Sequence, residues 1–185
     1  MHKVALLIAL CLVSSAALAD KAEKERKEIQ KIEKETLAKL YSVQPSAKGA
    51  VEGAAGYAMF SNFGMKILVA GTGNGKGVAV DRKTGRRTYM RMGEIQAGLG
   101  IGVKKFQVVF IFQDPAKLDA FINQGWEFGG QTTAAAATGD QGGSLQGALS
   151  VAPGVWMYQL TDKGLALEAT VKGTKYWKDS DLNAS

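Results

Sequence analysis

Residues 105–112 carry apolar side chains at both odd and even positions, and this pattern constrains the fold more than any other in the sequence. Successive side chains of a strand point to opposite faces of a sheet. A strand with apolar residues at both odd and even positions is therefore typical of a place in the sheet where both faces are covered. We expect a central strand here, with further layers of the protein packed on either side of it.

Several other segments have the composition of short strands, with turn residues between them. The strand candidates are 57–60, 65–70, 77–80, 88–92, 126–137, 155–160 and 165–171. Residues 161–164 read as a hairpin turn, and the small residues of 47–55 favour a short helix. The predicted fold class is α/β of the α+β type: a compact, mostly antiparallel β domain with a few helices and a charged N-terminal helix.

A helix is predicted directly after residues 105–112. Asp114 is suited to cap it, Pro115 to occupy its first position, and Gly125 to end it. One face of this helix is apolar and consists of Leu118, Phe121 and Ile122.

The first 19 residues have the pattern of a secretory signal peptide. Lys3 precedes an apolar run at 4–13 that is too short to span a bilayer, and an A-x-A site ends at Ala19. We expect cleavage between Ala19 and Asp20, followed by a charged helix at 20–44 and one domain at 45–185. The predicted location is the periplasm, with association with a membrane left open.

The sole Cys and the sole His of the chain lie inside the predicted signal peptide. The remaining residues therefore lack a disulfide, a thiol nucleophile and an imidazole, which are common requirements of catalysis and of transition-metal binding. We expect no enzymatic activity, no catalytic residues, no metal and no cofactor. A hydrolase that works without His is the least favoured alternative.

Residues 21–39 contain seven basic and five acidic side chains in alternation, as expected for a solvated helix. Its apolar stripe is narrow and consists of Ile29, Ile32, Leu37, Leu40 and Tyr41. The favoured interpretation is a helix that docks on the domain through this stripe. A helix lying on a membrane surface would need a broader apolar face.

Positive charge is concentrated between residues 76 and 105, in a chain of net charge +6. The segment 81–87 reads as the loop of a hairpin, with Gly85 where a positive φ is needed. A field of this sign favours anionic partners, whereas a merely solvated loop is the alternative. Nucleic acid is not an expected partner, because no recognition motif accompanies the charge. The candidate binding residues are Lys76, Arg82, Lys83, Arg86, Arg87, Arg91, Lys104 and Lys105.

Glycine recurs at every second position in two segments, 71–77 and 98–102. Glycines at every second position form a stripe that leaves one face of a strand without side chains. The first explanation we consider is close packing of another segment against this face, and the second is contact with a ligand. The spacing fits neither a P-loop nor a dinucleotide-binding loop. The tryptophans at 126, 156 and 177 are expected to serve as core or edge anchors.

The order of these glycine-centred segments resembles the SYLF domain family, a lipid-binding domain also described as an actin regulator in yeast. The resemblance covers residues 45–183 and is greatest to exported bacterial members. The matching segments are 55–60, 71–77, 84–85, 98–102, 108–121, 164–165 and 173–183.

The resemblance implies a compact α/β domain that binds phospholipid and is not an enzyme. A bacterial envelope normally offers neither phosphoinositide nor actin, so we expect anionic phospholipid or lipopolysaccharide headgroups as the target. The alternative function is a structural or protein-interaction module with a protein partner in the envelope, for which the charged helix at 20–44 is the candidate docking element.

Overall fold

A computed structural model describes residues 2–62, 72–95, 106–127, 145–166 and 174–184. The helices are α1 (His2–Val43), α2 (Ser46–Gly53) and α3 (Pro115–Gln124). The strands are β1 (Gly56–Ser61), β2 (Thr72–Asp81), β3 (Arg87–Ile95), β4 (Gln107–Phe112), β5 (Trp126–Glu127), β6 (Leu149–Ala152), β7 (Val155–Thr161), β8 (Gly164–Ala166) and β9 (Thr174–Lys178).

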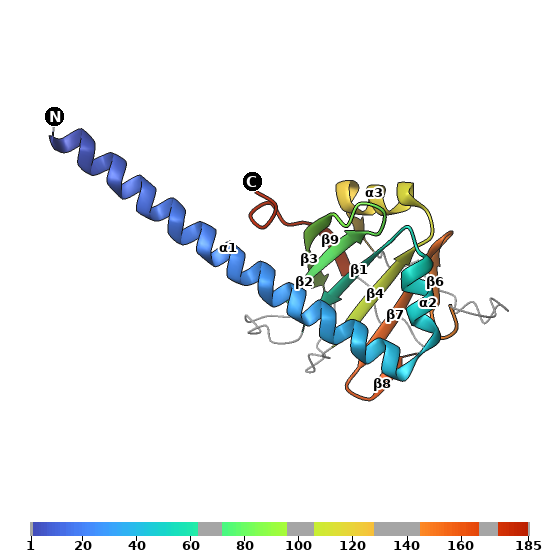
Figure 1. The fold of residues 1–185 in the computed structure, drawn as a ribbon. Helices are drawn as coiled ribbons and strands as arrows, with labels where there is room; N and C mark the ends of the chain where they lie inside the picture. The colour runs from blue at the N-terminus through green and yellow to red at the C-terminus, as the bar shows by residue number, and fades with distance from the viewer. Residues whose placement is uncertain (1, 63–71, 96–105, 128–144, 167–173, 185) are drawn as a thin grey trace.

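The described strands form one curled antiparallel sheet in the order β5-β9-β3-β2-β1-β4-β7-β6, with β8 paired to β7 (Figure 1). All residues of β4 are buried, and its neighbours are β1 and β7. The prediction of a central strand at this position is confirmed, and so is the α+β class with a charged N-terminal helix. The strand predicted at 65–70 lies outside the described residues, as do residues 128–137 and 167–171 of two others.

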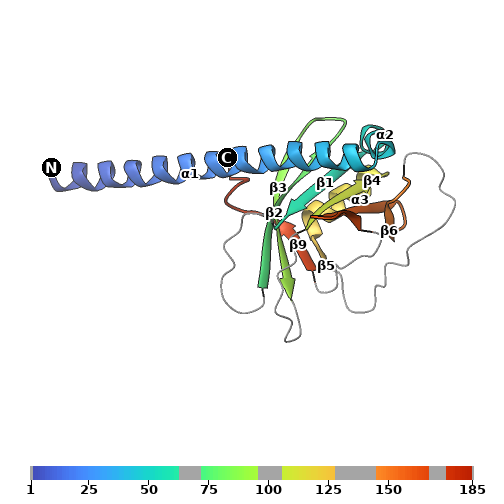
Figure 2. The ribbon, with the colours of Figure 1, turned by 90° about the horizontal axis from the view of Figure 1, so that it is seen from below.

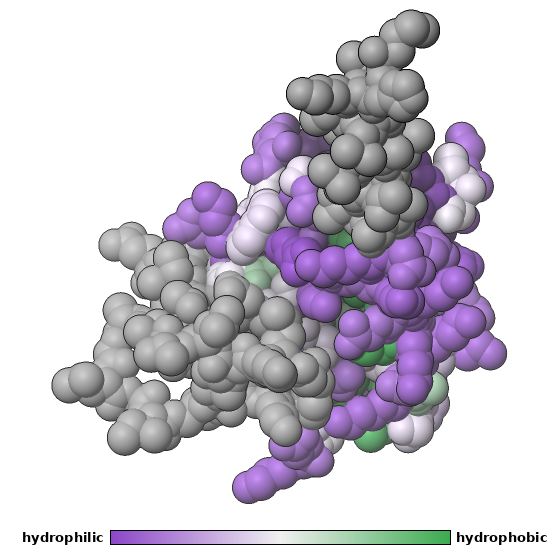
Figure 3. Space-filling model, turned by 90° about the vertical axis from the view of Figure 1, so that its left-hand side faces the viewer, coloured by the Kyte–Doolittle hydropathy of each residue, from purple (hydrophilic) through white to green (hydrophobic). Residues whose placement is uncertain are grey.

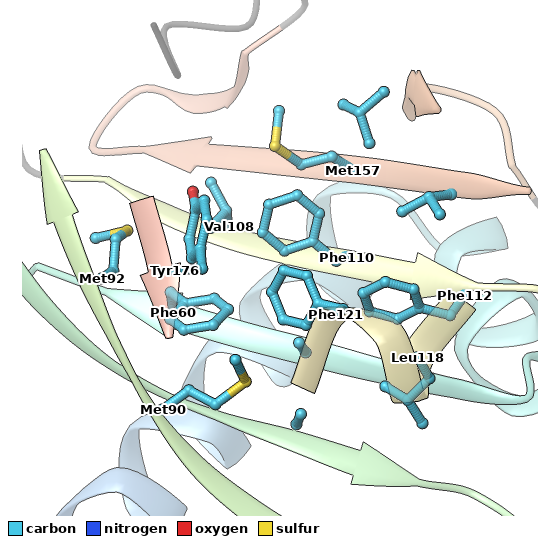
Figure 4. Packing of buried hydrophobic residues seen from close by; sticks show 14 of the residues in the cluster. Phe60, Met90, Met92, Val108, Phe110, Phe112, Leu118, Phe121, Met157 and Tyr176 are labelled. Carbon is cyan, nitrogen blue, oxygen red and sulfur yellow. The ribbon is translucent and has the colours of Figure 1, made fainter. Parts of the chain in front are cut away.

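One face of the sheet packs against α3 and closes over an aromatic core (Figure 4). The ring centroids of Phe110 and Phe121 are 5.6 Å apart, and those of Phe60 and Tyr176 are 4.6 Å apart. Such edge-on and tilted contacts stabilise a core beyond the burial of their area. They join β1, β4, β9 and α3, which are distant in sequence.

The predicted limits of α3 are confirmed. The carboxylate of Asp114 accepts a hydrogen bond from the backbone N of Ala116 at 2.8 Å, Pro115 is the first helical residue, and Gly125 has a φ of 71°. This cap satisfies a backbone N–H that the first helical turn leaves without a partner.

The opposite face of the sheet is covered by α1 and α2, and the first turns of α1 extend beyond the sheet (Figures 1 and 2). Ile29 and Leu40 of α1 are buried, and Ile32, Leu37 and Tyr41 are partly buried around them. The interpretation of a helix docked through a narrow apolar stripe is therefore confirmed. Its partners on the sheet include Met59, Val109 and Tyr158.

Gly77 and Gly75 of β2 lie where the chain packs too closely for a side chain. A Cβ on Gly77 would collide with the carbonyl oxygen of Met59 and the ring of Phe60. A Cβ on Gly75 would collide with the end of the Met92 side chain and approach the Ser61 oxygen to 2.9 Å. Close packing thus explains this part of the glycine stripe, whereas Gly71 and residues 98–102 lie outside the described residues.

Replacing Gly77 with Ala should lower the free energy of unfolding by about 1–3 kcal/mol, because a backbone oxygen cannot yield as a flexible side chain can. Chemical denaturation followed by circular dichroism measures the change. The matched control is Gly53→Ala in α2, where a Cβ would meet nothing within 4 Å. Equal stability of the two variants would contradict the packing explanation.

Candidate functional site

The loop between β2 and β3 is shaped by Asp81. Its Oδ1 accepts hydrogen bonds from the backbone N atoms of Lys83 at 2.8 Å and Thr84 at 2.9 Å. The hydrogen bond from the backbone N of Thr84 lowers the pKa of the Asp81 carboxyl. Desolvation opposes this shift, and the hydrogen bond from Lys83 adds to it. Gly85 has a φ of 71°, as predicted. The loop therefore has a defined conformation built from its own residues.

Arg82, Lys83 and Arg86 are exposed on this loop, and we call these three residues the hairpin tip. Among the described residues, no carboxylate lies within 4.0 Å of their charged nitrogens. A guanidinium nitrogen of Arg82 lies 3.5 Å from the carbonyl oxygen of Glu52. The hairpin tip therefore presents three positive charges to solvent without an ion-pair partner in the described part of the chain.

A depression of about 310 Å³ adjoins the hairpin tip, between the end of α2 and the start of α3, at the end of the sheet where Figure 1 shows these two helices. It is lined by Glu52, Ala54, Ala55, Asp81, Arg82, Lys83 and Pro115. Arg82 and Lys83 of the hairpin tip share this lining with the carboxylates of Glu52 and Asp81, so the depression is mixed in charge.

Lys76 and Arg91 lie further along β2 and β3, where α1 crosses them. The Oε1 atom of Glu25 is 3.2 Å from Lys76 Nζ and 3.1 Å from a terminal nitrogen of Arg91. Glu28 is 3.6 Å from Lys76, and the buried Asp179 pairs with Arg91. These carboxylates neutralise both cations and tie α1 and the C-terminal segment to the sheet.

Arg87 pairs with Glu33, a carboxylate on the buried face of α1 that is 2% exposed. The same carboxylate accepts a hydrogen bond from the Tyr57 hydroxyl at 2.5 Å. Burial, together with this bond to Glu33, raises the pKa of the Tyr57 phenol far above its usual range. A buried carboxylate is costly without partners, so both contacts are needed for α1 to dock with Glu33 inward.

The remaining polar residues on the buried face of α1 also find partners. Gln30 donates to the Tyr89 hydroxyl at 2.7 Å, and Thr36 accepts from the Gln107 amide at 2.7 Å. At the start of the docked segment, the Arg26 guanidinium donates to the carbonyl oxygens of Leu182 at 2.9 Å and Ala184 at 3.1 Å.

The structure therefore divides the predicted basic cluster. Arg82, Lys83 and Arg86 come together at the hairpin tip, while Lys76, Arg87 and Arg91 face α1 and are ion-paired. Lys104 and Lys105 lie outside the described residues. In the view along α1, the described surface is mostly hydrophilic, with small hydrophobic areas between polar side chains (Figure 3).

Sequence reasoning did not identify the acidic partners on α1. A usable signal was present, because Glu25 and Glu33 lie four residues to either side of Ile29, the centre of the buried stripe. Residues four apart share one face of a helix. An acidic residue inside an apolar stripe therefore indicates a cation on the surface that receives the helix.

Among the described residues, no helix is both long enough and apolar enough to cross a membrane. Nor do three or more potential metal ligands come together in the same ranges.

The sequence profile of the Ysc84 family, described as Las17-binding protein actin regulator, matches residues 93–185. This match covers half of the chain, and the chain belongs to this family, the family of the SYLF domain. Membership indicates a lipid-binding or actin-regulator-like module.

A particular relative is Beta cell expansion factor A of Aeromonas veronii, which is 41% identical over 146 residues. The aligned region is 79% of this chain and 54% of the relative, so the chain spans about half the length of that protein.

Replacing Glu33 with Gln should lower the free energy of unfolding by about 1–2 kcal/mol, less than for a fully buried pair because Arg87 is partly exposed. Thermal denaturation at neutral pH measures the loss. The control is Glu35→Gln, which removes an exposed carboxylate 3.9 Å from Lys31 and should change stability by less than about 0.5 kcal/mol. Similar losses in both variants would argue against Glu33 as the main polar anchor of α1.

Proposed function

We propose that this chain is a non-enzymatic, exported protein that binds the anionic headgroups of phospholipid or lipopolysaccharide at the cell envelope. The observation that carries the proposal is the hairpin tip, where three cations stand on a defined loop without an ion-pair partner among the described residues. Guanidinium and ammonium groups are the side chains best suited to phosphate oxygens. Membership in a family that includes lipid-binding modules supports the same function.

The attraction expected from the hairpin tip is moderate and sensitive to salt. Each Lys or Arg close to an anionic membrane contributes about 1 kcal/mol, and this attraction falls off within a Debye length. Three cations together therefore supply at most about 3 kcal/mol, or roughly a hundredfold in affinity at low ionic strength. The ion-paired Lys76, Arg87 and Arg91 contribute little, because α1 already neutralises them.

Export to the periplasm is part of the proposal and rests on the sequence of residues 1–19. The docking of α1 is compatible with cleavage after Ala19. In the described part of α1, the contacts with the domain begin at Ala22 and continue through Glu25, Ile29 and Glu33. A chain that starts at Asp20 keeps all of these contacts.

A second candidate is a protein-interaction module of the envelope. The family description names a protein, Las17, as the binding partner of its members. The solvent side of α1, which carries exposed residues such as Lys24, Lys27 and Lys31, offers a charged surface for such a partner.

The first test is cosedimentation of the mature protein, residues 20–185, with vesicles of phosphatidylcholine alone or mixed with phosphatidylglycerol. Binding should occur only to the anionic vesicles and should fall at high salt. The triple variant Arg82→Gln, Lys83→Gln, Arg86→Gln should bind at least about tenfold more weakly at low salt.

The matched control for this variant is Lys24→Gln, Lys27→Gln, Lys31→Gln, which removes the same charge from the solvent side of α1. It should retain most of the affinity. If both triple variants lose affinity equally, binding reflects net charge and not the hairpin tip. If the unmodified protein binds neither kind of vesicle, the protein-interaction function is favoured.

The proposed export of this chain leads to a separate prediction. Expression of the full chain in a Gram-negative host should give a periplasmic product whose mass corresponds to a chain beginning at Asp20. Intact mass spectrometry of the periplasmic fraction measures this. A cytoplasmic product that retains residues 1–19 would contradict it.

A further inference from the structure

The outer face of β9 carries an exposed aromatic side chain. Along this strand Thr174 and Tyr176 point inward and are buried, whereas Lys175, Trp177 and Lys178 are exposed. Trp177 is 38% exposed, and Val43 at 43% is the other exposed large hydrophobic side chain in the described part of the chain. The sequence predicted an anchor role for all three tryptophans. Trp156 is buried, Trp126 packs against the core, and Trp177 lies partly exposed on β9, next to the edge strand β5.

Trp177 belongs to neither of the two hydrophobic cores formed by the described residues. Tyr176 attaches β9 to the aromatic core, and backbone pairing joins the strand to β3 and β5. Arg91, the partner of Trp177 in register, points to the face that α1 covers. On this face α1 packs mainly against β1, β2 and β8, and Trp177 is 38% exposed in the described part of the chain.

We propose that the outer face of β9 is a second lipid contact, in which Trp177 enters the interfacial layer of the membrane and Lys175, on the same face of the strand, remains among the headgroups. The proposal rests on the function proposed above. Tryptophan is favoured at membrane interfaces because its ring is apolar and its N–H is polar. A lysine side chain beside it can lay its methylene groups along the apolar layer while its ammonium group stays in water.

Electrostatic attraction is not the main driving force of the proposed membrane contact at β9. Glu127 of β5 is exposed and lies opposite Lys175 in register, so part of the local positive charge is balanced. The expected contribution of β9 is therefore mainly apolar and insensitive to salt, in contrast to that of the hairpin tip.

The two contacts lie within reach of one membrane surface. Trp177 pairs with Arg91, which is five residues along the chain from Arg86 of the hairpin tip. Five residues of extended chain span roughly 17 Å. Electrostatic attraction at the tip and insertion of Trp177 can therefore act together, so that each strengthens the other.

Tryptophan fluorescence tests the proposal, with anionic vesicles of phosphatidylglycerol and phosphatidylcholine whose acyl chains carry bromine at a shallow position. Emission of the mature protein should shift to the blue and be quenched on binding. In Trp177→Thr most of the quenching should disappear, although Trp126 and Trp156 still emit, and vesicle affinity should fall about three- to tenfold. Trp177→Phe, a milder change that keeps the ring, should retain part of the affinity.

The control is Val43→Thr, which removes the other exposed hydrophobic side chain and should leave both quenching and affinity unchanged. Circular dichroism establishes that each variant is folded. The β9 contact would be overturned if the protein bound vesicles without quenching of Trp177, or if Trp177→Thr kept full affinity. Either result would leave the function proposed for the hairpin tip intact. Vesicle binding that is absent altogether would contradict both, and Trp177 would then be assigned to a protein interface.

Discussion

The burial of β1 and β4 on both faces is the constraint on which the rest of this structure depends. Every residue of these two strands is buried. A strand that is apolar on both sides is stable only when both sides are removed from water. On one side α3 and the curled sheet do this, and on the other side the task falls to α1 and α2.

The face of the sheet opposite α3 is covered by α1, a highly charged helix. The polar contacts between α1 and the sheet are a consequence of this arrangement. The apolar stripe of α1 is too narrow to fill its interface, so Glu33, Thr36 and Gln30 are carried inward with it. Each must find a partner, because an unpaired buried polar group costs more than a hydrogen bond returns. On the sheet, Arg87 and Tyr57 pair with Glu33, Gln107 pairs with Thr36, and Tyr89 pairs with Gln30.

The same docking sorts the basic residues into two groups. Cations on the part of β2 and β3 that α1 crosses are paired with its carboxylates, while those on the loop beyond the crossing are left to solvent. A cluster that is continuous in sequence is thus divided in space. Only the part that α1 does not reach remains available to an anionic partner.

Local features of the fold were predictable from the sequence, and long-range partners were not. The buried strand β4, the cap of α3 at Asp114 and the loop at Gly85 are encoded by residues close together in the chain. The pairing of Glu25 with Lys76 and Arg91, and of Arg91 with Asp179, joins segments far apart, and spacing within one segment does not reveal it. The exposure of Trp177 likewise depends on how segments far apart in the chain pack around β9. For these reasons the sequence predicted the fold class well, but it did not reveal that α1 pairs with three of the eight predicted binding residues.

The most direct test of this account compares two variants that each remove one lysine charge, Lys83→Gln at the hairpin tip and Lys76→Gln beneath α1. The measurement is the partition coefficient of each mature protein onto phosphatidylglycerol-containing vesicles at low salt. We expect Lys83→Gln to weaken partitioning about fivefold, the value of one cation near an anionic surface, and Lys76→Gln to leave it almost unchanged. An equal loss in both variants, or a larger loss for Lys76→Gln, would contradict the conclusion that α1 removes the paired cations from the binding surface.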